Sequence, residues 1–217
     1  MTPIIHSLIV SSIATAIAFI LMLPLAYLGA FKRYAGKWLV ESLLLLPLVL
    51  PPTVVGLYLL QAFGHYGLLG QALNFFNLTI IFNLSGAVIA SSIIILPLVY
   101  QGLKSAMAAV PKNLIDVAAT LSASPFEVLF RVILPNCWPA VLASILLSFS
   151  RALGEFGASL MVAGYIPGKT DTIANAIYFA VQNGEDTRAL QLSLVNVLFG
   201  LLVLSMIYAL TNRRKIS

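Results

Sequence analysis

Five long apolar segments, separated by shorter polar stretches, dominate the hydropathy pattern of this chain. They cover residues 5–31, 38–63, 80–103, 138–163 and 190–210. Each is longer than the roughly 20 residues that an α-helix needs to cross the hydrocarbon core of a bilayer. The pattern therefore predicts an all-α integral membrane protein with about five transmembrane helices, folded as one membrane domain over residues 1–217.

The composition agrees with a membrane location. Apolar residues make up 60% of the chain and charged residues 9%, with a mean hydropathy of +1.01, whereas soluble domains carry roughly 25% charged residues. The net charge of +5 fits the excess of basic residues in cytoplasmic loops, so no nucleic-acid partner is expected. The single cysteine, Cys137, excludes an internal disulfide and a multi-cysteine metal site.

Basic residues predict how the segments are oriented. Lys32, Arg33 and Lys37 follow the first segment, which no positive charge precedes, so this segment is expected to be a membrane span and not a cleavable signal peptide. The positive-inside rule then places the N-terminus outside and the C-terminus in the cytoplasm. With the spans alternating, nine of the twelve basic residues fall inside, and only Lys169 and Arg188 fall outside.

The polar stretch over residues 113–135 is predicted to lie in the cytoplasm and to form two short helices. Asn113 is expected to cap the first, with Asp116 at its third position. Leu114, Val117, Ala118 and Leu121 then follow at i, i+3, i+4 and i+7, which predicts one apolar stripe. Such a stripe between membrane spans indicates a surface that docks against another protein.

The second of these helices has its own start signal. Ser124 is a capping residue, Pro125 suits the first helical turn and Glu127 completes a capping box. The residue before a proline is disfavoured in the α region, so the first helix is expected to break over residues 122–124. The second helix is predicted to end near Pro135.

The fourth apolar segment contains a series of polar residues. Their spacing of 4, 3, 4 and 4 predicts one helical face, formed by Ser144, Ser148, Arg151, Glu155 and Ser159. Arg151 and Glu155 are one turn apart near mid-membrane, where an unpaired charge costs at least ~2.5 kcal/mol, so we expect them to pair. Two interpretations remain open: a packing ion pair, or a polar translocation path or gate.

Signatures of an enzyme are lacking in the sequence. Residues 163–170 fit the loosest phosphate-loop pattern but end a membrane span on the predicted outer side, where no nucleotide would meet them. His6 and His65 have no acidic residue at metal-ligand spacing, and the serines within the spans have no basic partner at membrane depth. We therefore expect no catalytic residue, metal site or cofactor site in this chain.

Part of the cytoplasmic stretch resembles the EAA loop of ABC importer permeases. The similarity rests on Asp116-Val117-Ala118-Ala119, on Ser122, and on the ending Val132-Ile133-Leu134-Pro135. Two positions depart from the family pattern, because Asp116 replaces the usual glutamate and Ser122 replaces the usual glycine. The second change is expected to make the turn between the two helices less free, although Pro125 still enforces it.

Three further stretches resemble the molybdate permease subfamily, with related versions in sulfate and thiosulfate permeases. They are residues 45–56 (LLPLVLPPTVVG), 151–158 (RALGEFGA) and 166–170 (IPGKT). The resemblance implies a type I ABC importer permease for a tetrahedral oxyanion, most closely molybdate. Sulfate, thiosulfate or tungstate permeases are the alternatives, and an ion-coupled secondary carrier is a more distant one.

The resemblance also implies an assembly in the cytoplasmic membrane of a prokaryote. In the lipid bilayer, two copies of the chain form a homodimer, a cytoplasmic ATPase subunit uses ATP and Mg²⁺, and an extracytoplasmic binding protein delivers the anion. The residues implied in ATPase coupling are Asp116, Val117, Ala118, Ala119, Leu121, Ser122, Pro125, Phe126, Glu127 and Arg131. Those assigned to the path or gate are Ser144, Ser148, Arg151, Glu155 and Ser159.

Overall fold

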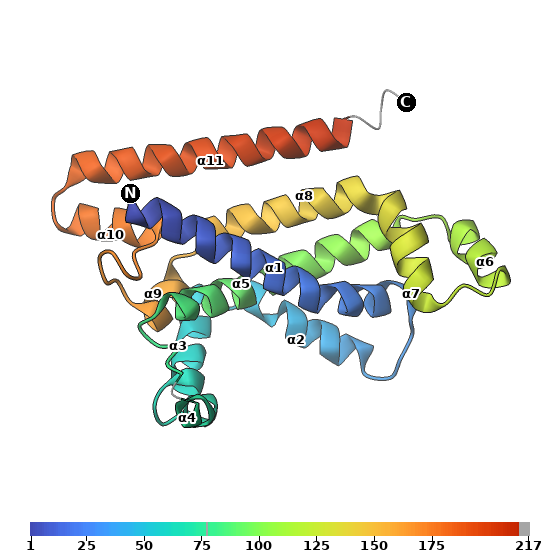
Figure 1. Cartoon of the computed structure of the whole chain (residues 1–217), viewed down its shortest axis with the longest axis horizontal. Helices are drawn as coiled ribbons and strands as arrows, with labels where there is room; N and C mark the ends of the chain where they lie inside the picture. Colours follow the sequence, from blue (N-terminus) through green and yellow to red (C-terminus); the bar gives the residue numbers. More distant parts are fainter. Residues whose placement is uncertain (77, 213–217) are drawn as a thin grey trace.

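The computed structural model describes residues 1–76 and 78–212, and all regular structure within these ranges is helical. Four long helices form the body of the molecule and run along its long axis (Figure 1). They are α1 (Thr2–Phe31), α5 (Leu84–Ala108), α8 (Leu134–Leu153) and α11 (Asp186–Asn212). The predicted all-α fold is therefore confirmed.

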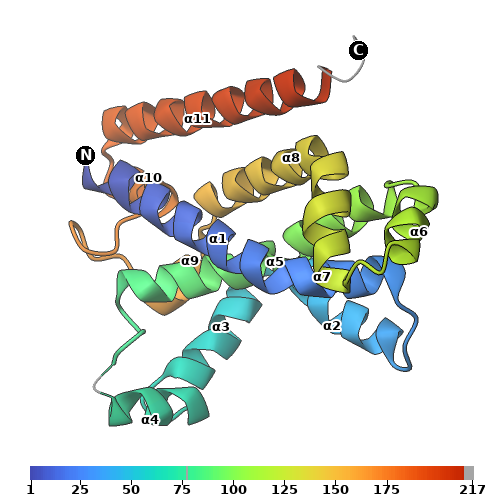
Figure 2. The same ribbon diagram turned by 45° about the vertical axis from the view of Figure 1, so that its right-hand side comes forward.

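The shorter helices lie mainly at the two ends of this body. At one end, near the N-terminus, are α4 (Leu68–Phe75), α9 (Gly157–Ala163) and α10 (Ile173–Gln182). At the other end are α6 (Lys112–Thr120) and α7 (Pro125–Glu127), which continues into the π-helix η1 (Val128–Ile133). In Figure 2 the helices α3 (Pro52–Phe63) and α4 project from one side as an arm.

Among the described residues, four helical segments are long and apolar enough to cross a membrane. They are Thr2–Phe31, Leu84–Ala108, Pro125–Leu153 and Asp186–Thr211. A fifth candidate is the pair α2 (Lys37–Val49) and α3, which bends by 111° at its break. The consecutive prolines Pro51 and Pro52 account for this break, since neither has an N–H to continue the helix. The count of four to five agrees with the predicted number of spans.

The main core lies where α1 packs along α5 and α8. Small residues on α1, among them Ala14, Ala18 and Ala26, are fully buried and let the helices approach closely. Gly29 serves the same purpose near the end of α1, because a Cβ atom there would lie 2.3 Å from the hydroxyl oxygen of Tyr100. These contacts hold α1, α5 and α8 together as the packed core of the molecule.

The helix that begins at Pro125 does not end near Pro135, so that prediction is wrong. It continues without interruption through η1 and α8 to Leu153. A proline inside an α-helix lacks one hydrogen-bond donor, and its ring meets the carbonyl four residues earlier. The π-helical turn over Val128–Ile133 directly precedes Pro135 and changes the hydrogen-bond register there, which lets the helix pass the proline.

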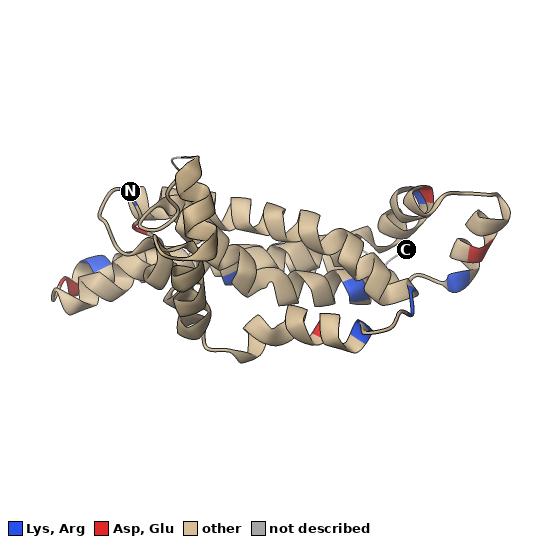
Figure 3. Ribbon diagram, turned by 90° about the horizontal axis from the view of Figure 1, so that it is seen from below, with Lys and Arg blue, Asp and Glu red and all other residues tan. Residues whose placement is uncertain are grey.

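Charged residues lie mainly toward the two ends of the long axis, and only a few interrupt the central helices (Figure 3). Helix α11 has few buried residues, and leucines such as Leu194, Leu198 and Leu201 are more than half exposed. Exposed apolar surface of this extent on a chain that spans a bilayer is suited to lipid or to another membrane subunit.

Candidate functional site

The hairpin of α6 and α7 stands away from the helical body at one end (Figures 1 and 2). α6 begins at Lys112, and its N-cap residue is Pro111, whose fixed φ and missing N–H suit a helix start. Asn113 is therefore not the cap, contrary to the prediction. It lies in the first turn, and its side-chain oxygen accepts a hydrogen bond from the Leu114 N–H at 3.0 Å.

The turn after α6 places Ser122 at a φ of 58°, in the left-handed region. This is the position at which the resembled family has glycine, so the structure supplies a physical reason for that glycine. An L-residue in this conformation costs about 1–2 kcal/mol, because its Cβ approaches the following carbonyl oxygen.

We therefore expect Ser122→Gly to stabilise the hairpin by about 0.5–1 kcal/mol, the relief of strain being partly offset by the larger entropy of an unfolded glycine. Amide hydrogen exchange of the Lys112–Glu127 segment would measure the change. Thr120→Gly, at the last residue of α6, is the comparison and is expected to speed exchange, since it adds backbone freedom and removes the hydrogen bond from the Thr120 hydroxyl to the Val117 carbonyl oxygen. Faster exchange in Ser122→Gly would contradict the prediction.

The start signal predicted for the second helix is present in full. The Ser124 hydroxyl accepts a hydrogen bond from the Glu127 N–H at 3.3 Å, and the Glu127 carboxylate accepts from the Ser124 N–H at 3.0 Å. Arg131 lies one turn further on, with its guanidinium 3.4 Å from the same carboxylate. Glu127 is thus engaged within its own hairpin, which fixes the angle at which α7 leaves the turn.

Four large apolar side chains on this hairpin are exposed, and we call them the coupling surface: Leu114, Val117, Leu121 and Phe126. Their exposed fractions run from 38% to 77%. Ala118 does not belong to it, although the predicted stripe includes it, because it is buried in the core of its own chain together with Val128 and Leu129. Among the other residues assigned to coupling, those exposed beside this surface are Asp116, Ala119, Ser122, Pro125 and Arg131.

The fourth apolar segment is broken toward the end of the molecule opposite the hairpin. α8 ends at Leu153 and α9 begins at Gly157, so Glu155 lies in the break. Ser144, Ser148 and Arg151 are on α8, whereas Ser159 is on α9. The prediction of one continuous helical face is therefore wrong beyond Arg151.

The break packs against the other helix break of the chain. A Cβ atom on Gly157 would lie 3.2 Å from the Cβ of Pro52, and one on Gly56 would lie 2.9 Å from the Cα of Ala158. These glycines allow α9 and α3 to touch closely, just after the bend between α2 and α3. Discontinuous helices that meet inside a membrane bundle are typical of transport sites.

The expected ion pair forms at this junction. An Arg151 guanidinium nitrogen lies 2.8 Å from a Glu155 carboxylate oxygen, and the other oxygen accepts a hydrogen bond from the Ala158 N–H at 3.0 Å. The two side chains differ in burial: 1% of Glu155 is exposed, compared with 37% of Arg151. Glu155 thus holds the first turn of α9 to the end of α8, and Arg151 presents part of its charge to the surface.

The serines assigned to the path are packed between helices. Ser144 faces Gly102 of α5, where a Cβ would lie 1.8 Å from the serine hydroxyl oxygen. Ser148 and Ser159 are buried. The hydroxyls of Ser148 and Ser159 are therefore enclosed by their own chain, whereas Ser144 also lines a cavity of about 470 Å³.

The other end of the molecule contains a polar cluster that the sequence did not predict. Asp171 accepts a hydrogen bond from the Thr2 hydroxyl at 2.9 Å, and its other oxygen is 2.7 Å from the His6 Nδ1. These residues are more than 160 positions apart, so spacing could not reveal them. Burial raises the pKa of Asp171, but hydrogen bonds from the Gly168 N–H, Thr2 and His6 outweigh it and hold the pKa below its usual value.

The depressed pKa means that the Asp171 carboxylate stabilises the fold above the pKa of the unfolded chain, near 3.9, and that this contribution is lost as the pH falls through the lower folded-state value. We expect Asp171→Asn to lower stability by about 2 kcal/mol at pH 7. Thermal unfolding of both proteins from pH 7 to pH 3 would measure the difference, which should shrink below about pH 4. A difference independent of pH would contradict this assignment.

The same cluster explains the residues that mimic a phosphate loop. The Thr170 hydroxyl accepts a hydrogen bond from the Ile166 N–H at 2.9 Å, and Gly164 and Gly168 have φ values of 67° and 77°. The loop therefore folds on itself and on Asp171. Its hydroxyl and backbone donors are engaged in this internal structure rather than arranged around a ligand.

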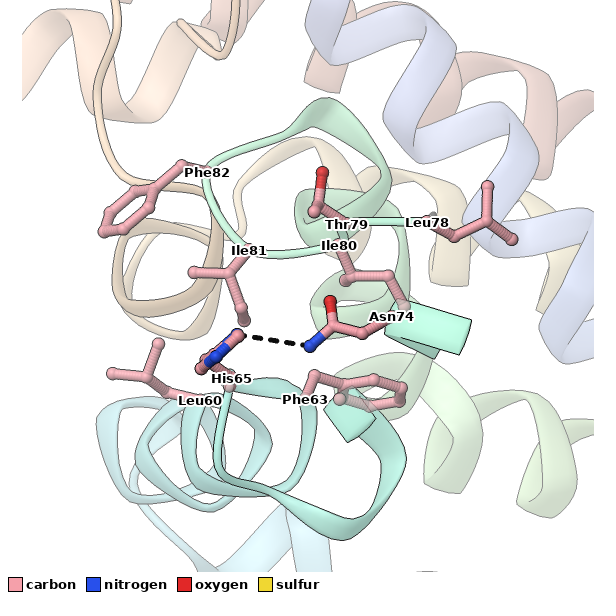
Figure 4. A pocket seen from close by; sticks show the side chains of 11 residues that line it. Leu60, Phe63, His65, Asn74, Leu78, Thr79, Ile80, Ile81 and Phe82 are labelled. Carbon is pink, nitrogen blue, oxygen red and sulfur yellow. Dashed lines mark hydrogen bonds between the residues drawn. The ribbon is translucent and has the colours of Figure 1, made fainter. Parts of the chain in front are cut away.

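A cavity of about 410 Å³ opens between α3, α4 and the linker that leads to α5 (Figure 4). His65 and Asn74 meet in its lining, with the His65 Nδ1 3.2 Å from the Asn74 amide nitrogen. The rest of the lining is mainly apolar, including Leu60, Phe63 and Ile81. Within residues 1–76 and 78–212, no three His, Cys, Asp or Glu side chains are grouped to hold a metal.

Over residues 22–216 the sequence matches a family described as the inner membrane component of binding-protein-dependent transport systems. This chain belongs to that family. The match includes the coupling surface, both helix breaks and the Arg151–Glu155 pair. The expectation of an ABC importer permease is therefore confirmed.

Individual relatives are similar over nearly their whole length. The chain is 39% identical to the putative molybdenum transport system permease protein YvgM of Bacillus subtilis, over 87% of this chain and 83% of that one. It is 38% identical to the molybdenum transport system permease protein ModB of Azotobacter vinelandii, over 92% and 88% of the two chains.

Solved structures show the same fold at low sequence identity. A chain of the bacterial alginate ABC transporter, in complex with an alginate-bound periplasmic protein, has a TM-score of 0.75 at 16% identity and covers 98% of this chain and 78% of its own. A chain of the inward-facing MetNI methionine ABC transporter has a TM-score of 0.71 at 15% identity, covering 96% and 94%. The fold is that of type I ABC importer permeases.

Proposed function

We propose that this chain is the permease subunit of an ABC importer that moves molybdate across the cytoplasmic membrane of a prokaryote. The observation that supports the substrate is the similarity to molybdenum permeases, at 36–39% identity over 83–88% of their length. Sulfate, thiosulfate and tungstate are tetrahedral oxyanions too, and they are the competing substrates.

In this proposal a separate ATPase subunit, which uses ATP and Mg²⁺, docks on the coupling surface. Leu114, Val117, Leu121 and Phe126 supply apolar contact area, and exposed apolar patches rimmed by polar residues mark interaction sites. Asp116 and Arg131 flank this area and would orient the partner through charge.

The helix from Pro125 to Leu153 would transmit the movement of the ATPase. It has 29 residues, so its length measured along the helix axis is about 40 Å at 1.5 Å per residue. One end begins at the hairpin of the coupling surface, and the other ends beside the Arg151–Glu155 pair and the two helix breaks. Figures 1 and 2 show that the helix changes direction between η1 and α8, so a displacement of the hairpin would reach the junction through this bend and along α8.

A second copy of the chain would complete the pathway. Ser148 and Ser159 are enclosed by the helices of their own chain, whereas Arg151 presents 37% of its side chain outward. Placing this face against its counterpart in a homodimer would line a polar route between the copies. A route that holds an anion weakly suits transport, because tight binding would trap it.

The charge distribution supports an orientation with the coupling surface in the cytoplasm. The helix ends that lie toward the coupling surface carry basic residues: Lys32 follows α1, Lys37 begins α2, Lys104 lies near the end of α5 and Lys112 begins α6. The positive-inside rule then puts the N-terminus outside, where the binding protein would deliver the anion. The basic residues 213–215, which also enter this prediction, lie outside the described residues.

The test is ATP hydrolysis by the reconstituted importer, with its ATPase and binding protein, in proteoliposomes. We expect molybdate to stimulate hydrolysis and uptake, and sulfate to do so much less. Stronger stimulation by sulfate would show that sulfate, and not molybdate, is the transported anion. Uptake by the permease alone, driven by a proton or sodium gradient without ATP, would establish the ion-coupled carrier instead.

A further inference from the structure

A polar cluster between α2 and α5 lies apart from the junction described above. The Glu41 carboxylate on α2 receives two hydrogen bonds on one oxygen, from the Lys104 ammonium at 2.5 Å and from the Tyr100 hydroxyl at 2.8 Å. Lys104 also lies 5.6 Å from the centre of the Tyr100 ring. Two strong donors on α5 thus converge on one anionic oxygen.

The cluster borders open space. Glu41, Tyr100 and Lys104 line a cavity of about 330 Å³, together with Gln101 and Ser105. Gln101 and Ser105 also line a neighbouring cavity of about 470 Å³, whose wall includes the predicted path serine Ser144. Two adjoining cavities therefore lead from Ser144 on α8 to Lys104 near the end of α5.

The element that supplies the carboxylate is weakly anchored. α2 has no fully buried residue, and only Leu44 and Leu45 pack against the core from one face. In the Glu41–Lys104 pair, 23% and 31% of the two side chains are exposed. A pair that is this accessible to water contributes little, about 1 kcal/mol, so another anion can compete for its donors.

We propose that Tyr100 and Lys104 form an anion-binding site at the coupling end of the pathway, in which the transported oxyanion takes the place of the Glu41 carboxylate. The inference rests on the proposed function for the identity of the anion. A tetrahedral dianion presents oxygens in place of the carboxylate oxygen and attracts Lys104 more strongly, because its charge is larger.

The exchange has a mechanical consequence. When the anion binds Lys104, Glu41 loses its hydrogen-bond donor and is repelled by the bound dianion. The polar contact that holds α2 to α5 is then broken. Return of Glu41 then displaces the anion toward the coupling-surface end. Lys37, which is anchored to the Gly29 carbonyl oxygen at 2.5 Å, adds positive charge near the exit.

The test uses equilibrium binding of radiolabelled molybdate and sulfate to the purified permease–ATPase complex without binding protein. Glu41→Gln removes the competing charge, so we expect about fivefold tighter binding of the dianion, together with slower import in proteoliposomes. Lys104→Gln should weaken binding about tenfold, and Lys104→Arg should retain it. Tyr100→Phe should give an intermediate loss.

Glu185→Gln and Arg188→Gln are the matched controls, since they break an exposed pair of similar length, 2.9 Å, at the opposite end. If the cluster only held α2 against α5, Glu41→Gln would lower thermal stability without tightening the binding of the dianion. That result would overturn the proposal. Equilibrium binding tests the anion site, and import in proteoliposomes tests the proposed substrate. Lys104-dependent binding supports the site even if wild-type complex imports neither anion, which would refute the proposed substrate instead.

Discussion

Replacing Arg151 by methionine is expected to reduce the free energy of unfolding of the permease by about 3 kcal/mol. The substitution leaves the Glu155 carboxylate, of which only 1% is exposed, without its positive partner. Removing one member of a buried pair costs about 3–5 kcal/mol, because the remaining charge stays desolvated. We take the lower end, since Arg151 is partly exposed. Denaturant titration of the purified chain in detergent measures the loss.

Two comparisons make this test specific. Glu155→Gln keeps an acceptor for the Ala158 N–H, and the charge that it leaves unpaired is that of Arg151, which reaches the surface. The free energy of unfolding should therefore fall by less than in Arg151→Met. Arg188→Met removes the same side chain from the exposed Arg188–Glu185 pair and should cost less than about 1 kcal/mol. Equal losses in Arg151→Met and Arg188→Met would show that the burial of Glu155 has no energetic consequence.

Changing Leu121 to glutamate should separate the permease from its ATPase without unfolding it. Leu121 is 77% exposed on the coupling surface, so the free chain tolerates the charge. In the complex the carboxylate would be buried without a partner, at a cost of about 2 kcal/mol or more, which lowers affinity about 30-fold. Retention of the ATPase during affinity purification of the permease, and titration of the ATPase in detergent, measure this loss.

Leu68→Glu is the matched control, because Leu68 is 88% exposed on α4 at the other end of the molecule. It should leave ATPase retention unchanged. Ala118→Glu should behave differently from both, lowering the stability of the permease itself, since Ala118 is buried in the core. If the Leu121→Glu permease retained the ATPase as well as the wild type does, the coupling surface would not be part of the interface with the ATPase.

Local signals predicted the hairpin well where the chemistry is local. Ser124, Pro125 and Glu127 form the expected capping box because its hydrogen bonds span three residues. The apolar stripe was harder to interpret. Spacing shows which residues share a helix face, but not which edge of that face packs on its own chain, and so Ala118 was assigned to the wrong surface.

The breaks and the long-range pairs could not be derived from periodicity. The apolar segment continues on both sides of Arg151 and Glu155, and the break between α8 and α9 becomes evident only from the packing of Gly157 against Pro52 and Thr53 of α3. Glu41 and Lys104 are 63 positions apart, and Thr2 and Asp171 are 169 apart. The sequence offered one sign of the Glu41–Lys104 pair: each residue lies near the end of an apolar segment, and charges in membrane segments usually have partners.

The π-helical turn ahead of Pro135 has a consequence for how this helix tolerates changes in length. A wider turn contains one more residue than an α-helical turn over the same advance. Deleting a single residue within Val128–Ile133 can therefore convert the turn to ordinary α-helix while both flanks keep their facing. The same deletion in the middle of α8 would rotate everything on one side of it by about 100°. The turn is thus the place where this helix can lose a residue with least disturbance to either end.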